Sequence, residues 1–227
     1  MCGRYTQTQS AQAIAGAFQL STAPPAPPRY NIAPTQLVGA VVQTQRQPER
    51  QFRVLRWGLV PSWAKDPAVG NRLINARSET VAEKPSFRSA LRYRRCLLVA
   101  DGFYEWQREG RKKQPYYFQL EDHQPFGFAG LWEQWESQTT GEVLETCTIL
   151  TTAANEMLRP IHDRMPVILH PDEYDRWLDP ELNQSTQILP LLQPYPAAAM
   201  TSYPVSPLVN KATSDRPECI QPLEKSL

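Results

Sequence analysis

Cysteine and histidine are scarce in this sequence, and long apolar segments are missing from it. Four cysteines and three histidines occur among 227 residues, with no CxxC pair and no HxxxH or HxH spacing. Because zinc sites and redox motifs use such spacings, we expect no metal site and no other cofactor. No run of about 20 apolar residues could cross a bilayer, and no apolar signal segment opens the chain. These absences predict a cytoplasmic protein that has no membrane partner.

The net charge of +1 conceals an uneven distribution along the chain. Residues 1–113 contain 18 Lys and Arg against 7 Asp and Glu, whereas residues 114–227 contain 6 against 16. A basic half is typical of a surface that binds a polyanion, and its many arginines suit bidentate contacts with phosphate. The alternative is that both signs interleave on the folded surface. Sequence alone leaves both interpretations open.

Apolar spacing predicts several helices and one extended strap. The segments expected to be helical are 10–20, the stretch after Ser78, 86–94, 153–162 and 172–179. Four prolines within 24–28 exclude a helix there, so residues 21–36 are expected to form an extended strap across the surface.

Strands dominate the middle of the chain. Apolar and β-branched runs at 37–44, 52–63, 96–107, 115–122, 125–135 and 146–154 are separated by polar turns. This pattern predicts a single α+β domain around a curved, mainly antiparallel sheet with short flanking helices. We expect the domain to span residues 1–210 and residues 211–227 to form a flexible C-terminal tail. The strand residues Cys96 and Cys147 are expected to be buried.

The opening MCGRYT raises the question of why Cys2 follows the initiator methionine. A residue this small allows Met1 to be removed, which would place a thiol with a pKa near 8.5 beside an α-amine with a pKa near 8. Two nucleophiles would then share one residue. Alternatively, Cys2 is an incidental thiol on a frayed terminus.

Glu105 and His162 are the other candidate catalytic residues. Glu105 interrupts the aromatic strand GFYEW, where burial would raise its pKa into the range useful for general acid–base catalysis. The alternative is a glutamate at a strand edge that points to water. His162 lies in the irregular stretch PIHDR and is either catalytic or structural, whereas His123 and His170 are expected at the surface.

Arginines beside tryptophans suit single-stranded nucleic acid, because cations follow the phosphates and aromatic rings stack on unpaired bases. The candidates are Arg4, Arg56, Arg77 and Arg164, together with Trp57 and Trp63. At least three of the six tryptophans are expected in the core instead.

The motifs MCGRY, YNIAPTQ, RWGLVPSWAKD, INARSET, SFRSALRYRRCLLVADGFYEW, FAGLWEQW and TILTTAANEMLRPIHDRMPVIL resemble the SRAP (SOS-response-associated peptidase) family of abasic-site shields. They occur in the family's order over about residues 1–210. The resemblance implies the SRAP fold and a mature N-terminal Cys2 that forms a thiazolidine with an abasic site in single-stranded DNA. An internal cysteine could not close this ring.

The resemblance also implies roles for individual residues. Glu105 would shuttle protons and assist removal of Met1, His162 would protonate the sugar ring oxygen, and Asn75 would orient the N-terminus. Arg77, Arg164 and Arg4 would contact phosphates. The residues that would stack on bases or wedge a junction between single and double strands are Trp106, Trp63 and Pro34.

Two other functions remain as alternatives to this covalent sensor. One is a peptidase or amidase with an N-terminal cysteine nucleophile, and the other is a non-covalent single-strand binder. The sensor, with self-processing peptidase activity and possible lyase activity, best explains the arginines together with Cys2 and Glu105. We expect a monomer, nucleoid-associated if the source is bacterial, whose partner is DNA containing abasic sites.

Overall fold

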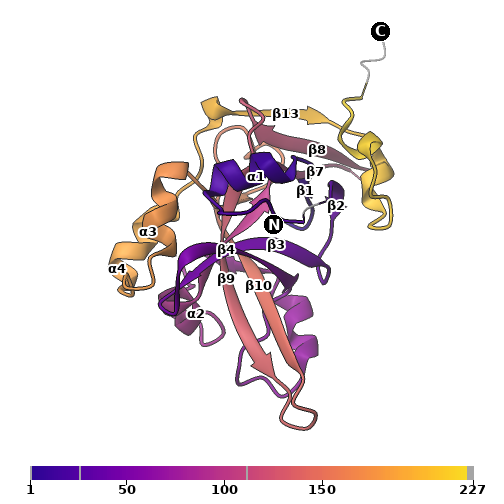
Figure 1. Cartoon of the computed structure of the whole chain (residues 1–227). Coiled ribbons are helices and arrows are strands. Elements are labelled where there is room, and N and C mark those ends of the chain that lie inside the picture. Colours follow the sequence, from indigo (N-terminus) through magenta and orange to yellow (C-terminus); the bar gives the residue numbers. More distant parts are fainter. Residues whose placement is uncertain (1, 26, 111, 224–227) are drawn as a thin grey trace.

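Two β-sheets and short helices make up the molecule (Figure 1). The computed structural model describes residues 2–25, 27–110 and 112–223. Met1 and residues 224–227 of the expected tail therefore lie outside the described residues. Among the residues that are described, no helix is both long and apolar enough to span a membrane.

The first sheet has five strands in the order β13-β8-β7-β1-β2. Their bounds are Tyr5–Gln7 (β1), Arg29–Ile32 (β2), Gly102–Glu109 (β7), Lys112–Leu120 (β8) and Met200–Pro204 (β13). All of these pairings are antiparallel. The expected proline-rich strap thus ends in an edge strand, β2.

The second sheet has eight strands. Their bounds are Leu37–Thr44 (β3), Gln47–Trp57 (β4), Asn75–Arg77 (β5), Arg95–Ala100 (β6), Phe126–Glu136 (β9), Val143–Ala153 (β10), Arg164–Pro166 (β11) and Ile168–Leu169 (β12). Pairings β10–β4, β4–β3, β3–β6, β6–β9 and β9–β10 form a closed circuit. Closure leaves fewer unpaired strand edges. Most pairings are antiparallel, but β10 runs parallel to β4 and β5.

Helices are few and short. The α-helices are Ala11–Phe18 (α1), Arg88–Tyr93 (α2), Tyr174–Leu178 (α3) and Ser185–Ile188 (α4). The 3₁₀ turns are Pro67–Arg72 (η1), Pro171–Glu173 (η2), Leu189–Leu191 (η3), Ala197–Ala199 (η4), Pro207–Asn210 (η5) and Pro217–Ile220 (η6). The α1 helix begins at Ser10, whose side chain accepts a hydrogen bond from the backbone N–H of Ala13, as expected of an N-cap.

Alternation along β6 divides the core into two layers. Cys96, Leu98 and Ala100 join the cluster between the sheets, with Tyr5 and Phe103. Leu97 and Val99 face the opposite side, in a cluster with Ile14 of α1, Leu91 of α2 and Trp177 of α3. This two-residue period is the expected geometry of a strand that is buried on both faces. A third cluster, which includes Tyr104, Tyr117, Val209 and Cys219, covers the outer face of the first sheet.

The predicted fold class, a single α+β domain with mainly antiparallel strands, is confirmed, but several boundaries were wrong. The strand expected over 52–63 ends at Trp57, because Gly58 has φ 131°, which favours glycine. The strand expected over 96–107 breaks at Asp101, and its two halves join different sheets. The helices expected after Ser78 and over 153–162 are turns, in stretches interrupted by Pro85 and Pro160.

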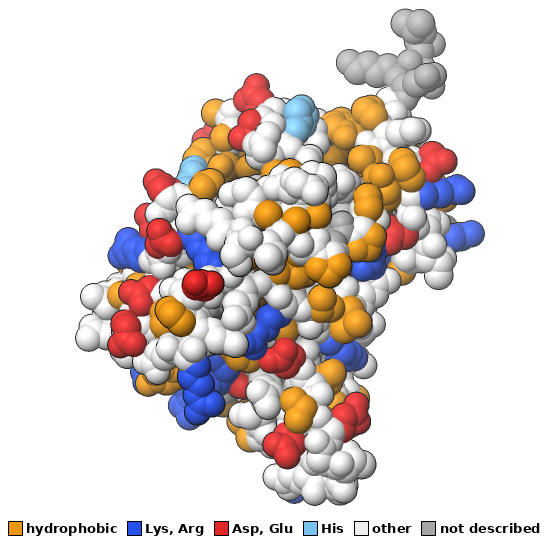
Figure 2. Space-filling model, in the orientation of Figure 1, with side chains coloured by type: hydrophobic (Ala, Val, Ile, Leu, Met, Phe, Trp, Pro, Cys, Tyr) orange, Lys and Arg blue, Asp and Glu red, His pale blue; other side chains and the backbone are white. Residues whose placement is uncertain are grey.

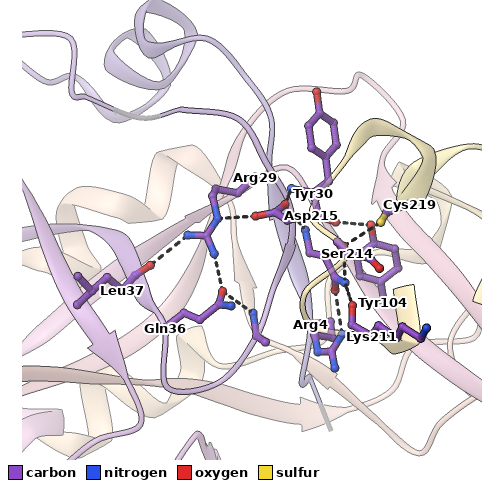
Figure 3. A network of polar contacts seen from close by, with 12 residues as sticks. Arg4, Arg29, Tyr30, Gln36, Leu37, Tyr104, Lys211, Ser214, Asp215 and Cys219 are labelled. Carbon is purple, nitrogen blue, oxygen red and sulfur yellow. Dashed lines mark hydrogen bonds and ion pairs between the residues drawn. The ribbon is translucent and has the colours of Figure 1, made fainter. Parts of the chain in front are cut away.

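Residues 211–223, which were assigned to the expected tail, contact the domain. Cys219 is fully buried, and the side chain of Asn31 donates to the carbonyl oxygens of Lys211 and Ser214. The Asp215 carboxylate accepts from Arg29 (2.8 Å) and from the backbone N–H of Asn31 (3.1 Å), as Figure 3 shows for Arg29. This C-terminal segment therefore lies directly over β2.

Candidate functional site

Cys2 precedes β1, in a segment that continues beside β7. This segment runs antiparallel to β7. Tyr5 pairs with Phe103, and the backbone N–H of Tyr104 donates to Arg4 O. Cys2 is fully buried and belongs to the cluster between the sheets. The described part of the N-terminus is thus part of the core, not a frayed end.

Glu105 is buried on β7, with 3% of its surface exposed. The alternative of an edge glutamate in water is therefore wrong. Burial raises the pKa of the Glu105 carboxyl above its ordinary value, and the nearby His162 partly offsets this. Burial also raises the pKa of the Cys2 thiol, and the charge of Glu105 raises it further. The two groups are thus electrostatically coupled, and the resting thiol holds its proton.

Asn75 contacts the same terminus from β5. Alternation along this strand buries Ala76 and turns Asn75 and Arg77 the other way. The Asn75 side chain donates from Nδ2 to the carbonyl oxygen of Cys2 at 2.8 Å. Its Oδ1 is buried and accepts no hydrogen bond from the described part of the chain. Asn75 therefore fixes the position of Cys2 and keeps an acceptor beside it.

His162 presents a partly exposed ring, with 29% of the side chain exposed. Its Nδ1 accepts a hydrogen bond from the backbone N–H of Arg164 at 2.9 Å, so the neutral ring carries its hydrogen on Nε2. The Asp163 carboxylate also lies 3.0 Å from Nδ1. Because Nδ1 can donate to Asp163 only when it is protonated, the backbone contact describes the neutral ring and the carboxylate is placed to stabilise the charged one.

A surface pocket of about 710 Å³ joins these elements. Its lining residues are Arg4, Glu105, Trp106, Arg108, Lys113, Pro160, Ile161, His162, Asp163 and Asn210. Glu105 and His162 therefore line one surface pocket, together with residues of the β7–β8 hairpin, residues 160–163 and Asn210 of η5. Cys2 is not among the lining residues.

The three arginines predicted to contact phosphates differ in their exposure and in their partners within the protein. Arg77 is exposed on β5. The Arg164 guanidinium forms an ion pair with both carboxylate oxygens of Glu79, at 2.5 and 2.9 Å, and donates to Thr151 O at 2.7 Å. Arg4 donates to Val209 O of η5 at 2.7 Å and to Asn31 Oδ1 at 3.0 Å, and Figure 3 shows it near Lys211.

The predicted base-contacting residues are not all together. Trp106 is half-buried, lines the pocket and donates from Nε1 to Asn210 Oδ1 at 2.7 Å. Trp63 is 64% exposed, and Pro34 is half-buried just after β2. Neither of the last two lines the pocket.

Other sequence expectations about side chains are confirmed. Trp57, Trp132, Trp135 and Trp177 are buried, which accounts for four of the six tryptophans. Cys96 and Cys147 are buried strand residues, and His123 and His170 are exposed. Basic and acidic side chains lie interspersed on the face shown in Figure 2, which favours interleaving over a single basic stripe on that face.

Sequence reasoning did not select Asn210, Arg108, Lys113 or Glu79. Asn210 reaches Trp106 from 104 residues away, so no local pattern could reveal it. Arg108 and Lys113 stand in the basic run REGRKK, a signal that was treated only as a turn. Within the described residues, no group of three or more His, Cys, Asp and Glu side chains could hold a metal ion.

Comparison with known proteins shows the family. The profile described as "SOS response associated peptidase (SRAP)" matches residues 1–212. The "Abasic site processing protein YoqW" of Bacillus subtilis (strain 168) is 42% identical over 225 residues, covering 97% of this chain and 99% of the relative. The "Abasic site processing protein HMCES" of Gallus gallus is 37% identical, covering 87% and 67%. A crystal structure of a protein from Bacteroides thetaiotaomicron superposes with a TM-score of 0.87 at 28% identity, covering 98% and 100%. The chain therefore belongs to the SRAP family.

Proposed function

We propose that this protein processes abasic sites in single-stranded DNA by crosslinking to them covalently through Cys2. One observation carries the proposal: buried Cys2 is held by a hydrogen bond from Asn75 and is electrostatically coupled to the buried carboxyl of Glu105, which lines a pocket together with His162. Relatives that bear the name abasic site processing protein support the same substrate.

The chemistry requires the amine of Cys2 to be free. Hydrolysis of the peptide bond between Met1 and Cys2 consumes one water and releases methionine. The α-amine then attacks C1′ of the ring-opened sugar aldehyde, and loss of one water gives an imine. Addition of the Cys2 sulfur to this carbon forms a C–S bond, while the thiol proton passes to the imine nitrogen. The product is a five-membered thiazolidine.

Glu105 suits the proton transfers of this sequence. Its pKa, raised by burial, brings the carboxyl closer to neutral pH, where a group can both accept and donate protons. Because the Cys2 thiol is protonated when buried, its proton needs an acceptor as sulfur attacks, and Glu105 is the coupled base. The same carboxylate would activate the water that removes Met1, which is the peptidase activity we propose.

His162 and Asn75 would act beside Glu105. Protonated His162, with Asp163 3.0 Å from its Nδ1, would donate the Nε2 proton to the sugar ring oxygen as the ring opens. It would then become the neutral ring, whose Nδ1 accepts from the backbone N–H of Arg164. The buried Oδ1 of Asn75 would accept a hydrogen bond from the α-amine that Cys2 carries after Met1 is removed. An imine that fails to close can undergo β-elimination, which is the origin of the proposed lyase activity.

Phosphates and bases next to the lesion would contact the surrounding side chains. The exposed Arg77 would contact a phosphate. Arg4 and Arg164 already bind partners within the protein, which limits their contribution to phosphate binding. Trp106 would stack inside the pocket, and the exposed Trp63 with Pro34 would meet the strand outside it, at a junction between single and double strands. We further propose that the protein acts as a cytoplasmic monomer, which is nucleoid-associated if its source is bacterial.

The decisive experiment is intact-mass spectrometry of the purified protein with and without an abasic single-stranded oligonucleotide. We expect a mass lower by one methionine, and an adduct equal to protein plus oligonucleotide minus one water. The Cys2→Ala variant should bind the DNA but form no such adduct. An adduct from Cys2→Ala, or none from the wild type, would refute the proposal. Cleavage of a supplied peptide by the wild type, without a DNA adduct, would instead support the peptidase alternative.

A further inference from the structure

Two cations face each other across the β7–β8 hairpin. The strand register places Arg108 directly opposite Lys113. Cβ atoms of directly opposed residues lie about 5 Å apart, and like charges in this position destabilise a hairpin. The repulsion is offset only if solvent or an anion screens it. This pair therefore differs from an ordinary solvated lysine or arginine.

Neither side chain is neutralised by a side chain that the structure describes. Both are exposed, and no described side chain forms a hydrogen bond or ion pair with either of them, in contrast to Arg4, Arg53, Arg94 and Arg164. Arg108 and Lys113 together present exposed donors on two paired strands.

Both cations line the same pocket as Glu105 and His162. Arg108 is three residues from Glu105 along β7, so the rise of a β-strand separates their Cα atoms by about 10 Å. This span corresponds to about three nucleotides at a rise of about 3.4 Å, and to fewer in an extended strand. A strand whose lesion reached Glu105 could thus place a nearby phosphate between the two cations.

We propose that Arg108 and Lys113 form a phosphate subsite that holds the DNA strand on one flank of the lesion, within three nucleotides of it. The subsite rests on the proposed function, because it assumes that an abasic strand enters this pocket. A phosphodiester is the ligand that fits, since it carries one negative charge and two acceptor oxygens for two convergent donors. The subsite sets the path of the strand over the β7–β8 hairpin.

The first test measures reversible binding of the full-length protein to single-stranded DNA that carries a tetrahydrofuran analogue, which cannot open to an aldehyde. R108A/K113A should lose about tenfold in affinity at low salt. Its plot of log affinity against log salt should be flatter by about 0.7, the slope of one phosphate contact on a single strand. Because the variant also removes a like-charge pair, its Tm should stay unchanged or rise.

The matched control is R88A/R92A, which removes two exposed arginines at i,i+4 on α2. Figure 1 shows α2 at the end of the molecule away from β7 and β8. The control changes net charge by the same amount, so a purely long-range effect would weaken both variants equally. Equal salt slopes for the two double variants would overturn the subsite.

The second test replaces one phosphate at a time by a neutral methylphosphonate on either side of the analogue. For the wild type, one linkage within three nucleotides should matter most, and R108A/K113A should be insensitive at that linkage alone. Equal sensitivity of both proteins at every linkage would refute the subsite. Crosslinking of the wild type to a true abasic strand separates the two hypotheses. If it crosslinks but R108A/K113A is as sensitive as the wild type at every linkage, only the subsite fails. If the wild type does not crosslink, the proposed function fails.

Discussion

Asn75 Nδ2 lies 2.8 Å from the carbonyl oxygen of Cys2, a hydrogen bond that joins residues 73 positions apart. Asn75 is on β5 of the second sheet, where the parallel pairing with β10 places it opposite Ile149. Cys2 precedes β1 in the first sheet. The bond therefore links the two sheets at the point where the proposed nucleophile lies.

Asn75→Ala should slow crosslinking without preventing folding. The change removes the donor to Cys2 O, and a hydrogen bond of this kind contributes about 1 kcal/mol, or about a fivefold to tenfold loss of rate if Cys2 becomes less well placed. Single-turnover crosslinking to an abasic oligonucleotide measures the effect. The matched control is Asn71→Ala, since Asn71 also makes one side-chain hydrogen bond, to Arg56. A wild-type rate for Asn75→Ala would remove Asn75 from the site.

Glu105→Gln should separate stability from activity. Burial raises the pKa of Glu105 in the folded protein, so above that pKa the native state holds a costly buried carboxylate that glutamine lacks. The variant should therefore have the higher Tm at pH 8. The difference should shrink as the pH falls through the raised pKa, and vanish below the ordinary carboxyl value of 4.5. Thermal unfolding from pH 4 to 8 tests this.

Crosslinking should show the matching pH dependence. If the ionised carboxyl is the base, the wild-type rate must fall as the pH decreases through the raised pKa of Glu105, at a pH above 4.5. Glu105→Gln should be slow at every pH and lack this limb. A wild-type rate that does not change from pH 5 to 9 would contradict the assignment of Glu105 as the base.

Sequence patterns predicted what depends on neighbours along the chain. The apolar run of 37–44 predicted a strand and the helical spacing of 10–20 predicted a helix, and β3 and α1 form there. Glu105 was identifiable because a carboxyl within an aromatic strand must either reach water or do chemistry. Cys2, His162, the arginines and Trp63 were also selected from the residues themselves, whereas the SRAP resemblance supplied Asn75, Trp106 and Pro34.

Contacts between distant segments could not be predicted in this way. The partition of 96–107 between two sheets depends on Asp101, whose carboxylate is satisfied by the distant Thr8 and Gln9. Likewise, Glu79 meets Arg164 only because β5 and β11 both pair with β10. Each contact requires the whole topology, which local propensity does not specify.

Glu79→Gln should strengthen binding to single-stranded DNA. The Glu79 carboxylate occupies both terminal nitrogens of Arg164, so it competes with a phosphate for the same donors. Removing its charge leaves Arg164 and the exposed Arg77 without the nearby anion. We expect affinity for uncleavable single-stranded DNA to rise severalfold and the salt slope to steepen by about 0.7.

The control for Glu79→Gln is Glu145→Gln, since Glu145 forms a comparable ion pair with Arg53 at 3.0 Å and does not line the pocket. Because half of the Glu79 side chain is exposed, losing its ion pair should reduce stability by no more than about 1 kcal/mol. Weaker DNA binding by Glu79→Gln would show that Glu79 supports Arg164 in its binding position instead of competing for it.

Asp101→Ala should impair both stability and crosslinking, because Asp101 anchors β1, the strand that directly follows Cys2. Its buried carboxylate accepts hydrogen bonds from the Thr6 hydroxyl (2.5 Å), the Thr8 hydroxyl (2.8 Å), the Thr8 N–H and the Gln9 N–H. Losing the acceptor leaves several donors unsatisfied and should lower the free energy of unfolding by about 3 kcal/mol. Urea unfolding measures this loss, and the exposed Asp122→Ala in the β8–β9 turn is the control.

The crosslinking rate of folded Asp101→Ala should fall as well, since β1 is then less firmly held against β7. A fully active, destabilised variant would show that the position of Cys2 depends on its hydrogen bond with Asn75 and not on the anchoring of β1.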